Sequence, residues 1–376
     1  MLRFMYSGIS GMKVNQNKLD VVGNNIANVS TTAFKSSRAA FSDMLYQNAG
    51  TASAPTSNKG GTNAKQIGLG AQLSSVNRVM SQGNALSTGR SLDVCIDGEG
   101  YLIVGTGPND YSAGSTLLSD DMSISSGNMD IKYTRDGNLT LDKDGNLLTA
   151  DGHRVLGYLL TSYDAKKGAI KTNSAYSSIN TATDTKEDTS VTPNLAVGDC
   201  MYVDADGLLK ADVNELQPLK IPEKVYCPAD SADSSSKAGW QKVSSFAIGK
   251  DGVITATLAN GKKTALGQIA TATFTNPEGL TAIGGNYYET SPNSGTEIIR
   301  TSVNIDKDKN GKDVTTEKKD NSKAFGDTIQ GCLEASNVDL TEQFTDMITA
   351  TRSFQASSKL ITTGDEILQT ITGLLR

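Results

Sequence analysis

The last forty residues of the chain carry a regular repeat of apolar side chains. One apolar side chain recurs every seven residues, and these positions are Leu340, Met347, Phe354, Ile361, Leu368 and Leu375. Phe344 begins a second, interleaved line that is otherwise small or polar. Such a spacing is typical of a coiled-coil seam, and Asp339 followed by Glu342 predicts a capping box at its start. Because the second line offers little apolar surface, the pattern predicts a helix that needs a partner helix.

The first thirty residues show a related spacing at the opposite end of the chain. Steps of three, four or seven residues separate its apolar positions, which are Leu2, Met5, Ile9, Met12, Leu19 and Ile26. Gly8, Gly11 and Gly23 fall inside this stretch, and each lowers helix propensity by about 1 kcal/mol relative to alanine. Glycine also lets neighbouring backbones approach closely. We therefore expect the two terminal helices to pair as a coiled coil and to become ordered on assembly.

Between the helices the hydrophobic period changes to two. Leu92, Val94 and Ile96 alternate with polar or small residues, and Asp-Gly dipeptides recur throughout the middle of the chain. This pattern predicts mainly antiparallel β structure, with a hairpin that turns at 97–100. The predicted fold class is α+β, with antiparallel strands in the middle and helices at both ends. The subunit is expected to be nested, elongated and multi-domain.

Changes in composition divide the chain into five parts. Gly, Ser, Thr and Asn gather in residues 47–66, and a second polar stretch covers 174–190. We expect a terminal helical domain (1–35 and 333–376), a linker or extended loop (36–70), a β domain (71–158 and 241–300), an inserted outer β domain (159–240) and a charged connector (301–332). A short helical pattern also begins at Phe34. This order brings the two termini to one end of the subunit.

Composition and charge exclude several classes of partner. The net charge is -6 and no basic face is evident, which argues against nucleic-acid and anionic-membrane partners. No run of about eighteen apolar residues is present, so no membrane span is expected. The N-terminus lacks an apolar h-region, so no cleavable signal peptide is expected either. Only 37% of residues are hydrophobic and 6% aromatic, which indicates that no core is large.

One segment has the spacing of a calcium-binding loop. The oxygen ligands would be Asp306, Asp308, Asn310 and Glu317, with Gly311 at the sixth position. Three lysines reduce its negative charge, and neither flank is a convincing amphipathic helix. A solvated charged loop is therefore the preferred interpretation. A secreted calcium-dependent β-rich binding module stays open as an alternative from a different class.

Catalytic chemistry finds little support in the residue pattern. His153 is the single histidine and follows an Asp-Gly turn, and no phosphate-binding loop or cysteine–histidine arrangement is present. A hydrolase built around His153 stays as the remaining alternative, but we expect no enzyme and no cofactor. The four cysteines are far apart and fit no metal spacing. They are expected to be thiols, with a Cys200–Cys227 disulfide left open.

Both ends of the chain resemble the bacterial flagellar rod and hook proteins. The N-terminal signature is carried by Met5-Tyr6-Ser7-Gly8-Ile9-Ser10-Gly11-Met12, Asn24-Asn25-Ile26-Ala27-Asn28 and Phe34-Lys35. The C-terminal one is carried by Ser336-Asn337-Val338-Asp339-Leu340, Met347-Ile348 and Arg352-Ser353-Phe354. Ser91-Leu92-Asp93-Val94, Asp97-Gly98-Glu99-Gly100 and Tyr133-Thr134-Arg135-Asp136-Gly137 match landmarks of the family's β domain. Ala33 departs from the pattern, since the family usually has glycine there.

The resemblance implies a structural role in a helical tube. Subunits would pass through the flagellar export apparatus without a cleavable signal peptide and polymerise with their terminal helices on the inner wall. An inserted outer domain is similar to that of hook subunits, so the resemblance implies a flexible joint that transmits torque, with the distal rod as the alternative. The implied partners are further copies of the chain, rod, hook-cap and hook–filament junction proteins, and export proteins. The implied location is the extracellular hook and basal body.

Overall fold

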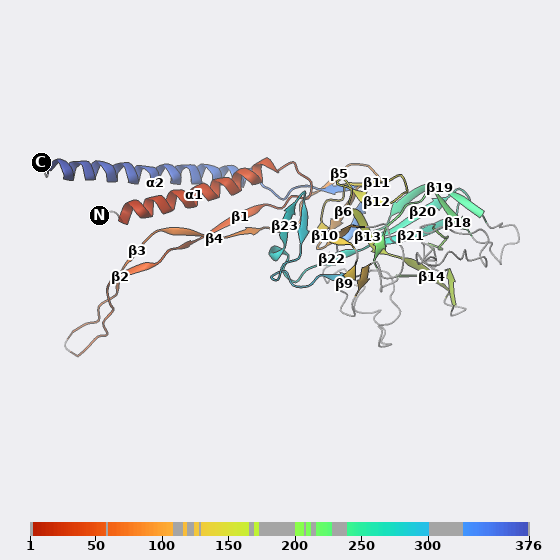
Figure 1. The fold of residues 1–376 in the computed structure, drawn as a ribbon, viewed down its shortest axis with the longest axis horizontal. Helices are drawn as coiled ribbons and strands as arrows, with labels where there is room; N and C mark the ends of the chain where they lie inside the picture. Colours follow the sequence, from red (N-terminus) through yellow and green to blue (C-terminus); the bar gives the residue numbers. More distant parts are fainter. Residues whose placement is uncertain are drawn as a thin grey trace. The chain divides into compact units, whose positions relative to one another are not determined.

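The computed structural model describes residues 3–57, 59–107, 116–118, 124–127, 129–164, 169–172, 200–206, 208–211, 216–227, 239–300 and 326–374. These residues form two compact units (Figure 1). Unit 1 comprises Met1–Ser81 with Ser336–Arg376, and unit 2 comprises Gln82–Ala335. Unit 1 therefore unites the two ends of the sequence, as the pattern of terminal helices predicts.

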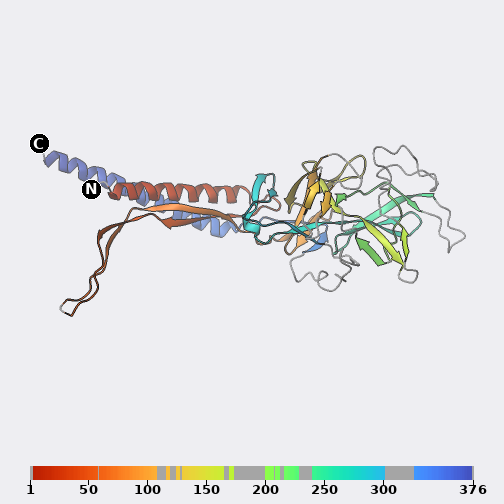
Figure 2. The ribbon, with the colours of Figure 1, turned by 60° about the horizontal axis from the view of Figure 1, so that its bottom comes forward.

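Unit 1 consists of two long helices and a β-ribbon. Its elements are α1 (Arg3–Ala27), β1 (Ser37–Asp43), β2 (Tyr46–Gly50), β3 (Lys65–Gly68), β4 (Ala71–Arg78) and α2 (Leu340–Leu374). The helices run antiparallel and side by side, α1 in red and α2 in blue (Figures 1 and 2). The Asp339 carboxylate accepts a 2.8 Å hydrogen bond from the amide of Thr341, so half of the predicted capping box is present. Pairing of the terminal helices is thus observed, whereas supercoiling as a coiled coil stays a prediction.

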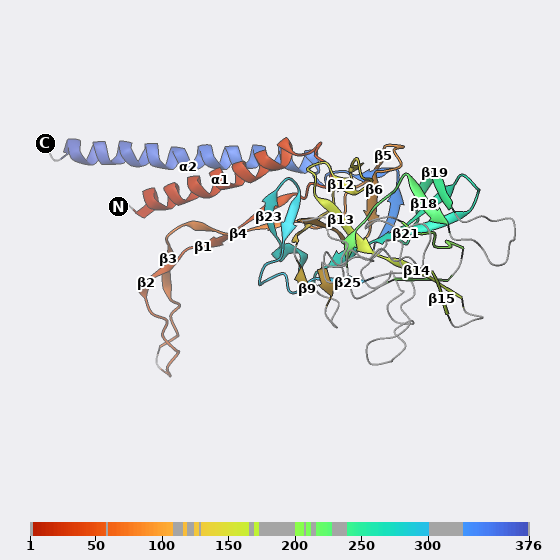
Figure 3. The same cartoon turned by 45° about the vertical axis from the view of Figure 1, so that its right-hand side comes forward.

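The segment expected to be a linker at 36–70 contains three strands. β1 pairs with β4 from Ser37↔Arg78 onward, and β2 pairs with β3. The amide of Met44 donates to the carbonyl of Gly70, so the two pairs follow one another as a single two-stranded ribbon (Figure 3). The short helix expected from Phe34 is wrong, because backbone pairing with β4 outweighs the weak helical spacing. β4 itself was expected in the β domain but belongs to unit 1.

Ala33 occupies a backbone conformation that normally favours glycine. Its φ is 56° and its side chain is only 1% exposed. An L residue in this left-handed region is strained by about 1–2 kcal/mol relative to glycine. The chain therefore keeps the turn after α1 even though alanine replaces the glycine that is usual in the family.

Replacing Ala33 by glycine is expected to leave the free energy of unfolding within about 1 kcal/mol of the parent. Relief of the strained φ offsets loss of a buried methyl group, which contributes about 0.8 kcal/mol. Ala350→Gly is the matched control, because Ala350 is 2% exposed in the regular helix α2. The control is expected to lose about 2 kcal/mol from propensity and burial together. Equal losses in chemical denaturation would contradict this account of Ala33.

Unit 2 is built almost entirely of β-strands. Its elements are β5 (Ala85–Ser87), β6 (Val94–Asp97), β7 (Tyr101–Thr106), β8 (Thr116–Leu118), β9 (Ile124–Gly127), β10 (Asp130–Thr134), β11 (Leu139–Leu141), β12 (Leu147–Thr149), β13 (Arg154–Tyr158), β14 (Leu160–Asp164), β15 (Ala169–Thr172), β16 (Leu208–Ala211), β17 (Gln217–Pro218), β18 (Lys224–Cys227), β19 (Gly239–Ile248), β20 (Val253–Leu258), β21 (Lys263–Ile269), β22 (Thr271–Thr273), the 3-10 turn η1 (Pro277–Gly279), β23 (Thr281–Gly284), β24 (Tyr287–Glu289), β25 (Ile298–Arg300), β26 (Asp327–Gln330) and β27 (Cys332–Glu334). The largest sheet has the order β18-β19-β20-β21-β13-β7-β10-β24-β23, with further strands attached beside it. Every named strand pair is antiparallel, as the period of two predicts.

Most of the predicted turns join paired strands. Asp251-Gly252 connects β19 to β20, and Asn260-Gly261 connects β20 to β21. The hairpin expected at 97–100 is wrong, since β6 pairs with β26 while β7 pairs with β10, β13 and β22. Gly98 and Gly100 take positive φ values of 114° and 144°, so the segment turns the chain without pairing its flanking strands. The glycines here specify the bend, but the tertiary fold determines which strands pair.

The boundaries expected inside unit 2 agree only in part with the sheets. β14, β15 and β16 lie in the expected insertion and form their own three-stranded sheet. β17 and β18 lie in the same expected insertion but pair with β13 and β19 of the large sheet. At the C-terminal side, β26 pairs with β6 where a charged connector was expected. β27, which pairs with β5 in unit 2, lies mostly where the terminal helical domain was expected to begin. The rest of that connector, 301–325, lies outside the described residues. Within unit 2, a separate outer domain at 159–240 stays a proposal.

Candidate functional site

The contact between α1 and α2 depends on small residues. A Cβ added at Gly8 would lie 3.5 Å from Ile361 and from the carbonyl oxygen of Ser357, and one at Gly11 would lie 3.1 Å from the Ser357 hydroxyl. On the opposite helix, a Cβ at Gly364 would lie only 2.7 Å from the Phe4 ring. The glycines therefore allow the two helix backbones to approach closely, as the sequence suggests for Gly8 and Gly11.

Polar contacts fix the register of the same helix pair. Lys18 forms a 2.9 Å ion pair with Asp346, and the Asn25 amide donates to Gln343 Oε1 at 3.0 Å. Both Lys18 and Asp346 are partly exposed, so the ion pair contributes little stability and mainly favours one alignment. Asn25 is 1% exposed, so its hydrogen bonds are protected from water.

The face of α2 that meets α1 differs by one residue from the predicted second line. Its small and polar members are Gln343, Ala350, Ser357 and Gly364. Phe344, which was expected to begin that line, is instead 49% exposed. Ala350 and Gly364 are small residues two seven-residue repeats apart, and this spacing is the sequence signal that indicates the face. Small residues add little apolar surface to the seam, but they permit the two helices to pack closely.

Gly364→Val is expected to lower the free energy of unfolding of unit 1 by about 1–3 kcal/mol. The valine would clash with Phe4, and overpacking of a close contact has that magnitude. The control is Gly8→Ala, whose methyl group would sit at ordinary contact distance and would gain up to about 1 kcal/mol of helix propensity. Thermal unfolding of both variants measures the difference. A stable Gly364→Val variant would show that the helices are not closely packed there.

Three signature residues hold the ends of the helices to the base of the ribbon. Asn25 exchanges two hydrogen bonds with the backbone of Ser37, at 2.8 and 2.9 Å. Asn337 accepts from the amide of Ser36 at 2.7 Å and donates to the carbonyl of Val79 at 2.7 Å. Lys35, only 2% exposed, donates to the carbonyl of Ser81 at 2.7 Å. These side chains bind backbone groups of residues 36–37 and 79–81, at the base of the ribbon.

The other sequence-predicted residues are spread over the faces of both helices. Met5, Met12, Leu19, Ile26, Met347, Ile361 and Leu368 are partly buried, whereas Ile9, Leu340 and Phe354 are 36–39% exposed. Local hydrogen bonds within and just after α1 involve Ser7, Asn24 and Asn28. The backbone carbonyl of Phe34 accepts a hydrogen bond from the amide of Asn337. Arg352 lies on the exposed side of α2. Leu2 and Leu375 lie outside the described residues.

Unit 1 exposes a large number of apolar side chains. On α1 and α2 these are Phe4, Tyr6, Ile9, Leu340, Phe344, Ile348, Phe354, Leu360, Ile367 and Leu374; on the ribbon they are Phe41, Met44, Leu45, Tyr46, Ile67, Leu73 and Val76. Two of them, Leu45 and Leu374, are 79% and 82% exposed. Extended apolar surface of this kind marks an interaction site. Unit 1 is therefore the candidate functional site, and its chemistry is that of packing against another macromolecule.

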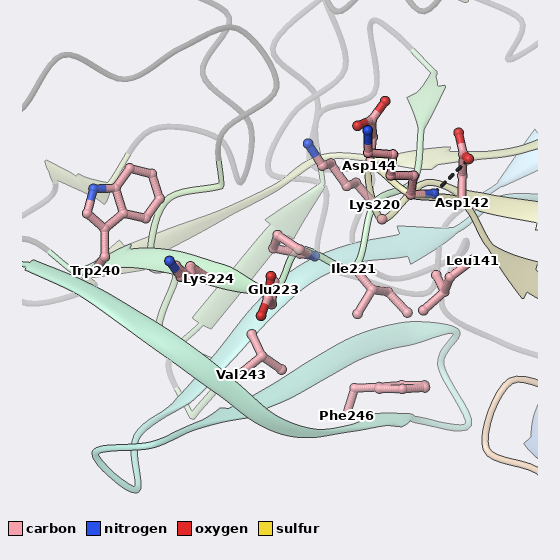
Figure 4. A pocket seen from close by; sticks show the side chains of 13 residues that line it. Leu141, Asp142, Asp144, Lys220, Ile221, Glu223, Lys224, Trp240, Val243 and Phe246 are labelled. Atoms are coloured by element: carbon pink, nitrogen blue, oxygen red, sulfur yellow. Dashed lines mark hydrogen bonds between the residues drawn. The ribbon is translucent and has the colours of Figure 1, made fainter.

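Unit 2 contains an open pocket of about 700 Å³ on the β11–β12 turn and strands β18 and β19 (Figure 4). Both apolar and charged side chains line it, including Leu141, Asp142, Lys220, Trp240 and Phe246. Trp240 is 40% exposed and its ring meets that of Tyr226 edge-on. None of the residues that line this pocket is a histidine or cysteine, so the pocket contains no nucleophile–imidazole pair.

The histidine and the cysteines that were considered as candidate catalytic or metal-binding residues have structural roles. His153 Nδ1 forms a hydrogen bond with the hydroxyl of Thr106 in β7, and its ring packs edge-on against Tyr287 in β24, so it links these two strands. The cysteines are present as thiols, and burial raises the pKa of Cys95 to about 11, so it stays protonated at neutral pH. Burial also raises the pKa of Cys227. The calcium-loop residues Asp306, Asp308, Asn310 and Glu317 lie outside the described residues.

The described residues contain neither a cluster of metal-binding side chains nor a membrane-crossing helix. No three carboxylate, histidine or cysteine side chains in the described part of the chain lie close enough to hold a metal ion. Neither helix has an apolar stretch that could cross a membrane, again counting only described positions.

Three family models match this chain. They are described as flagella basal body rod protein (residues 5–35), flagellar hook protein FlgE/F/G D1 domain (122–193) and flagellar basal body rod FlgEFG protein C-terminal (329–374). The first and third fall on the helical ends, where the signature residues lie. Together the descriptions name both rod and hook proteins, so they do not assign the chain to one kind of subunit.

Full-length relatives are found among rod and hook proteins. The flagellar basal-body rod protein FlgG of Bacillus subtilis (strain 168) is 36% identical over 376 residues, with 100% of both chains covered. The flagellar hook protein FlgE of Borreliella burgdorferi is 29% identical over 480 residues, again with 100% of both chains covered. A solved structure, Helicobacter pylori flagellar hook protein FlgE2, matches 66% of this chain and 100% of that one, with 13% identity and a TM-score of 0.34. On its full-length sequence relatives, the chain belongs to the family of bacterial flagellar rod and hook proteins, whose members are structural components of the flagellum.

Proposed function

We propose that this chain is a subunit that polymerises through unit 1 into an axial tube of the bacterial flagellum. The observation that carries the proposal is the apolar surface of α1, α2 and the ribbon, which a subunit alone leaves in water. Burial of such surface yields about 25 cal/mol per Å², so many copies packed by these faces gain substantial stability. Unit 2, whose apolar side chains are mostly in its own core, would occupy the outer layer.

The partners follow from the same proposal. The principal partner is a further copy of the chain, and the ends of the tube would meet neighbouring rod, hook-cap or hook–filament junction proteins. Subunits would travel through flagellar export proteins. The glycines within α1 suit this route, because they weaken the isolated helix and let it order on assembly.

Between the two kinds of axial subunit, we propose the rod. Alignments with the rod proteins of Bacillus subtilis and Agrobacterium fabrum extend over 376 and 378 residues, close to the length of the chain. Alignments with the hook proteins of Borreliella burgdorferi and Treponema pallidum extend over 480 and 481 residues. The hook relatives therefore carry segments with no counterpart here. The hook, expected from the sequence, is the second candidate, and the separate β14–β16 sheet in the expected outer domain favours it.

Genetic replacement separates the two candidates. The chain would be expressed in a flagellated bacterium that lacks its own FlgG-type rod protein, and in a sister strain that lacks its hook protein. We expect basal bodies with a completed rod in the first strain and no hook in the second, as scored by electron microscopy. Completed hooks in the second strain alone would overturn the rod assignment and support the hook.

A further inference from the structure

Helix α2 extends well past the start of α1. Gly364 lies against Phe4 and Met5, close to the first described residue of α1. From Gly364, α2 continues through Leu374, which is about 15 Å at 1.5 Å per residue. We call residues 366–374 the overhang. Its last turns have no described α1 residue opposite them.

The overhang is apolar on the side that continues the α1–α2 contact. The line of α2 residues that faces α1 passes through Ser357 and Gly364, and its next member at the same spacing is Ile371. Ile367 and Leu374 are 50% and 82% exposed. Because the contact surface continues beyond its partner, another helix-sized surface is needed to cover it.

Unit 1 also contains an apolar groove of about 620 Å³ between α1 and the ribbon. Its apolar walls are Tyr6, Ile9 and Val14 from α1 and Met44, Leu69, Ala71 and Leu73 from the ribbon. Lys13 is the single charged residue that lines it. Tyr6 is 67% exposed, so the groove opens to solvent.

The subunit's own α2 is already engaged elsewhere on α1. Gly8 and Gly11 meet α2, whereas Tyr6, Ile9 and Lys13 line the groove. At 3.6 residues per turn these two sets lie on opposite faces of α1. The overhang therefore does not reach the groove of its own chain while the helix pair is formed.

We propose that the overhang of one copy docks into the groove of a second copy. This inference rests on the proposed function and specifies its contact. Ile367, Ile371 and Leu374 would cover the apolar walls. The one charge of the overhang, Glu366, is opposite in sign to Lys13, so docking brings no like-charge repulsion. Overhang and groove are different surfaces, so the contact is heterologous, and repetition of such a contact builds an open helical polymer.

Disulfide trapping between two singly substituted chains tests the contact. Leu73→Cys places a thiol in the groove, and Leu374→Cys places one on the overhang. The two full-length variants are mixed in equal amounts under polymerising salt, and copper-catalysed oxidation by dissolved oxygen removes two electrons and two protons from each thiol pair. We expect a covalent dimer that mass spectrometry assigns to the 73–374 bridge. Ile283→Cys, also on an exposed apolar position but in unit 2, replaces Leu73→Cys as the control and is expected to give none.

A second variant and electron microscopy separate this inference from the proposed function. Leu73→Asp, at a 37% exposed position, is expected to keep the fold and to raise the subunit concentration needed for polymerisation at least tenfold. Polymers that form without the 73–374 bridge, or that form equally well from Leu73→Asp, would overturn the docking contact alone. Dispersed chains under all conditions would overturn both the docking contact and the proposed function.

Discussion

Replacing Arg135 by methionine is expected to lower the free energy of unfolding of unit 2 by about 3–5 kcal/mol. The guanidinium and the Glu334 carboxylate form a 2.8 Å ion pair whose side chains are 3% and 0% exposed. Loss of the cation would leave a buried, uncompensated carboxylate. Chemical denaturation followed by the fluorescence of Trp240 measures the change.

The large effect follows from what Arg135 holds together. It also donates to the carbonyls of Ile96 and Gly98, and its guanidinium lies 5.7 Å from the centre of the Tyr101 ring. Glu334 in turn accepts from the amide of Gly83 at 2.9 Å. Gly83 and Glu334 lie at the two places where the chain enters and leaves unit 2. The Arg135–Glu334 ion pair therefore holds the two ends of unit 2 together.

An exposed ion pair of unit 2 provides the control for Arg135. Lys242 and Glu223 are 4.0 Å apart and 69% and 78% exposed, so Lys242→Met is expected to change stability by less than about 1 kcal/mol. An Arg135→Met variant as stable as Lys242→Met would contradict the closing role of the buried pair.

Asn25→Asp is expected to destabilise unit 1 by about 2–4 kcal/mol. The substitution keeps the shape but removes the amide donor, which loses the hydrogen bonds to the carbonyl of Ser37 and to Gln343 Oε1. The new carboxylate would also be buried and face those same acceptors. Each buried acceptor left without a donor costs about 1–3 kcal/mol.

Asn28 offers a matched control in the same signature. Its amide donates only to Asn24, four residues earlier and at an exposed site. Asn28→Asp is therefore expected to stay within about 1 kcal/mol of the parent in thermal unfolding. Equal losses for the two variants would show that Asn25 does not join the helices to the ribbon.

Sequence periodicity predicted what depends on local spacing. The two terminal helices, the antiparallel character of the middle and several Asp-Gly turns could all be predicted, since each is encoded by neighbouring residues. The face of α2 was misplaced because Phe344 is apolar, yet Gly364 is what meets Phe4. An apolar residue on a helix that assembles does not have to face its own chain.

Other features depend on partners distant in sequence. Residues 36–70 look like a linker because 47–66 are rich in Gly, Ser, Thr and Asn, and 37–50 become strands only through pairing with 65–78. The 97–100 turn specifies a bend, while β6 finds its partner more than 200 residues later in β26. The buried role of Asn25 depends likewise on Ser37 and Gln343. Spacing alone does not encode these contacts.

Negative-stain electron microscopy of the purified chain tests the central claim most directly. The full-length chain under polymerising salt is compared with the same chain lacking residues 337–376, which removes α2 and leaves unit 2 complete. We expect tubes from the full chain and dispersed, folded particles from the shortened one. Tubes from the shortened chain, or dispersed particles from both, would contradict assembly through the terminal helices.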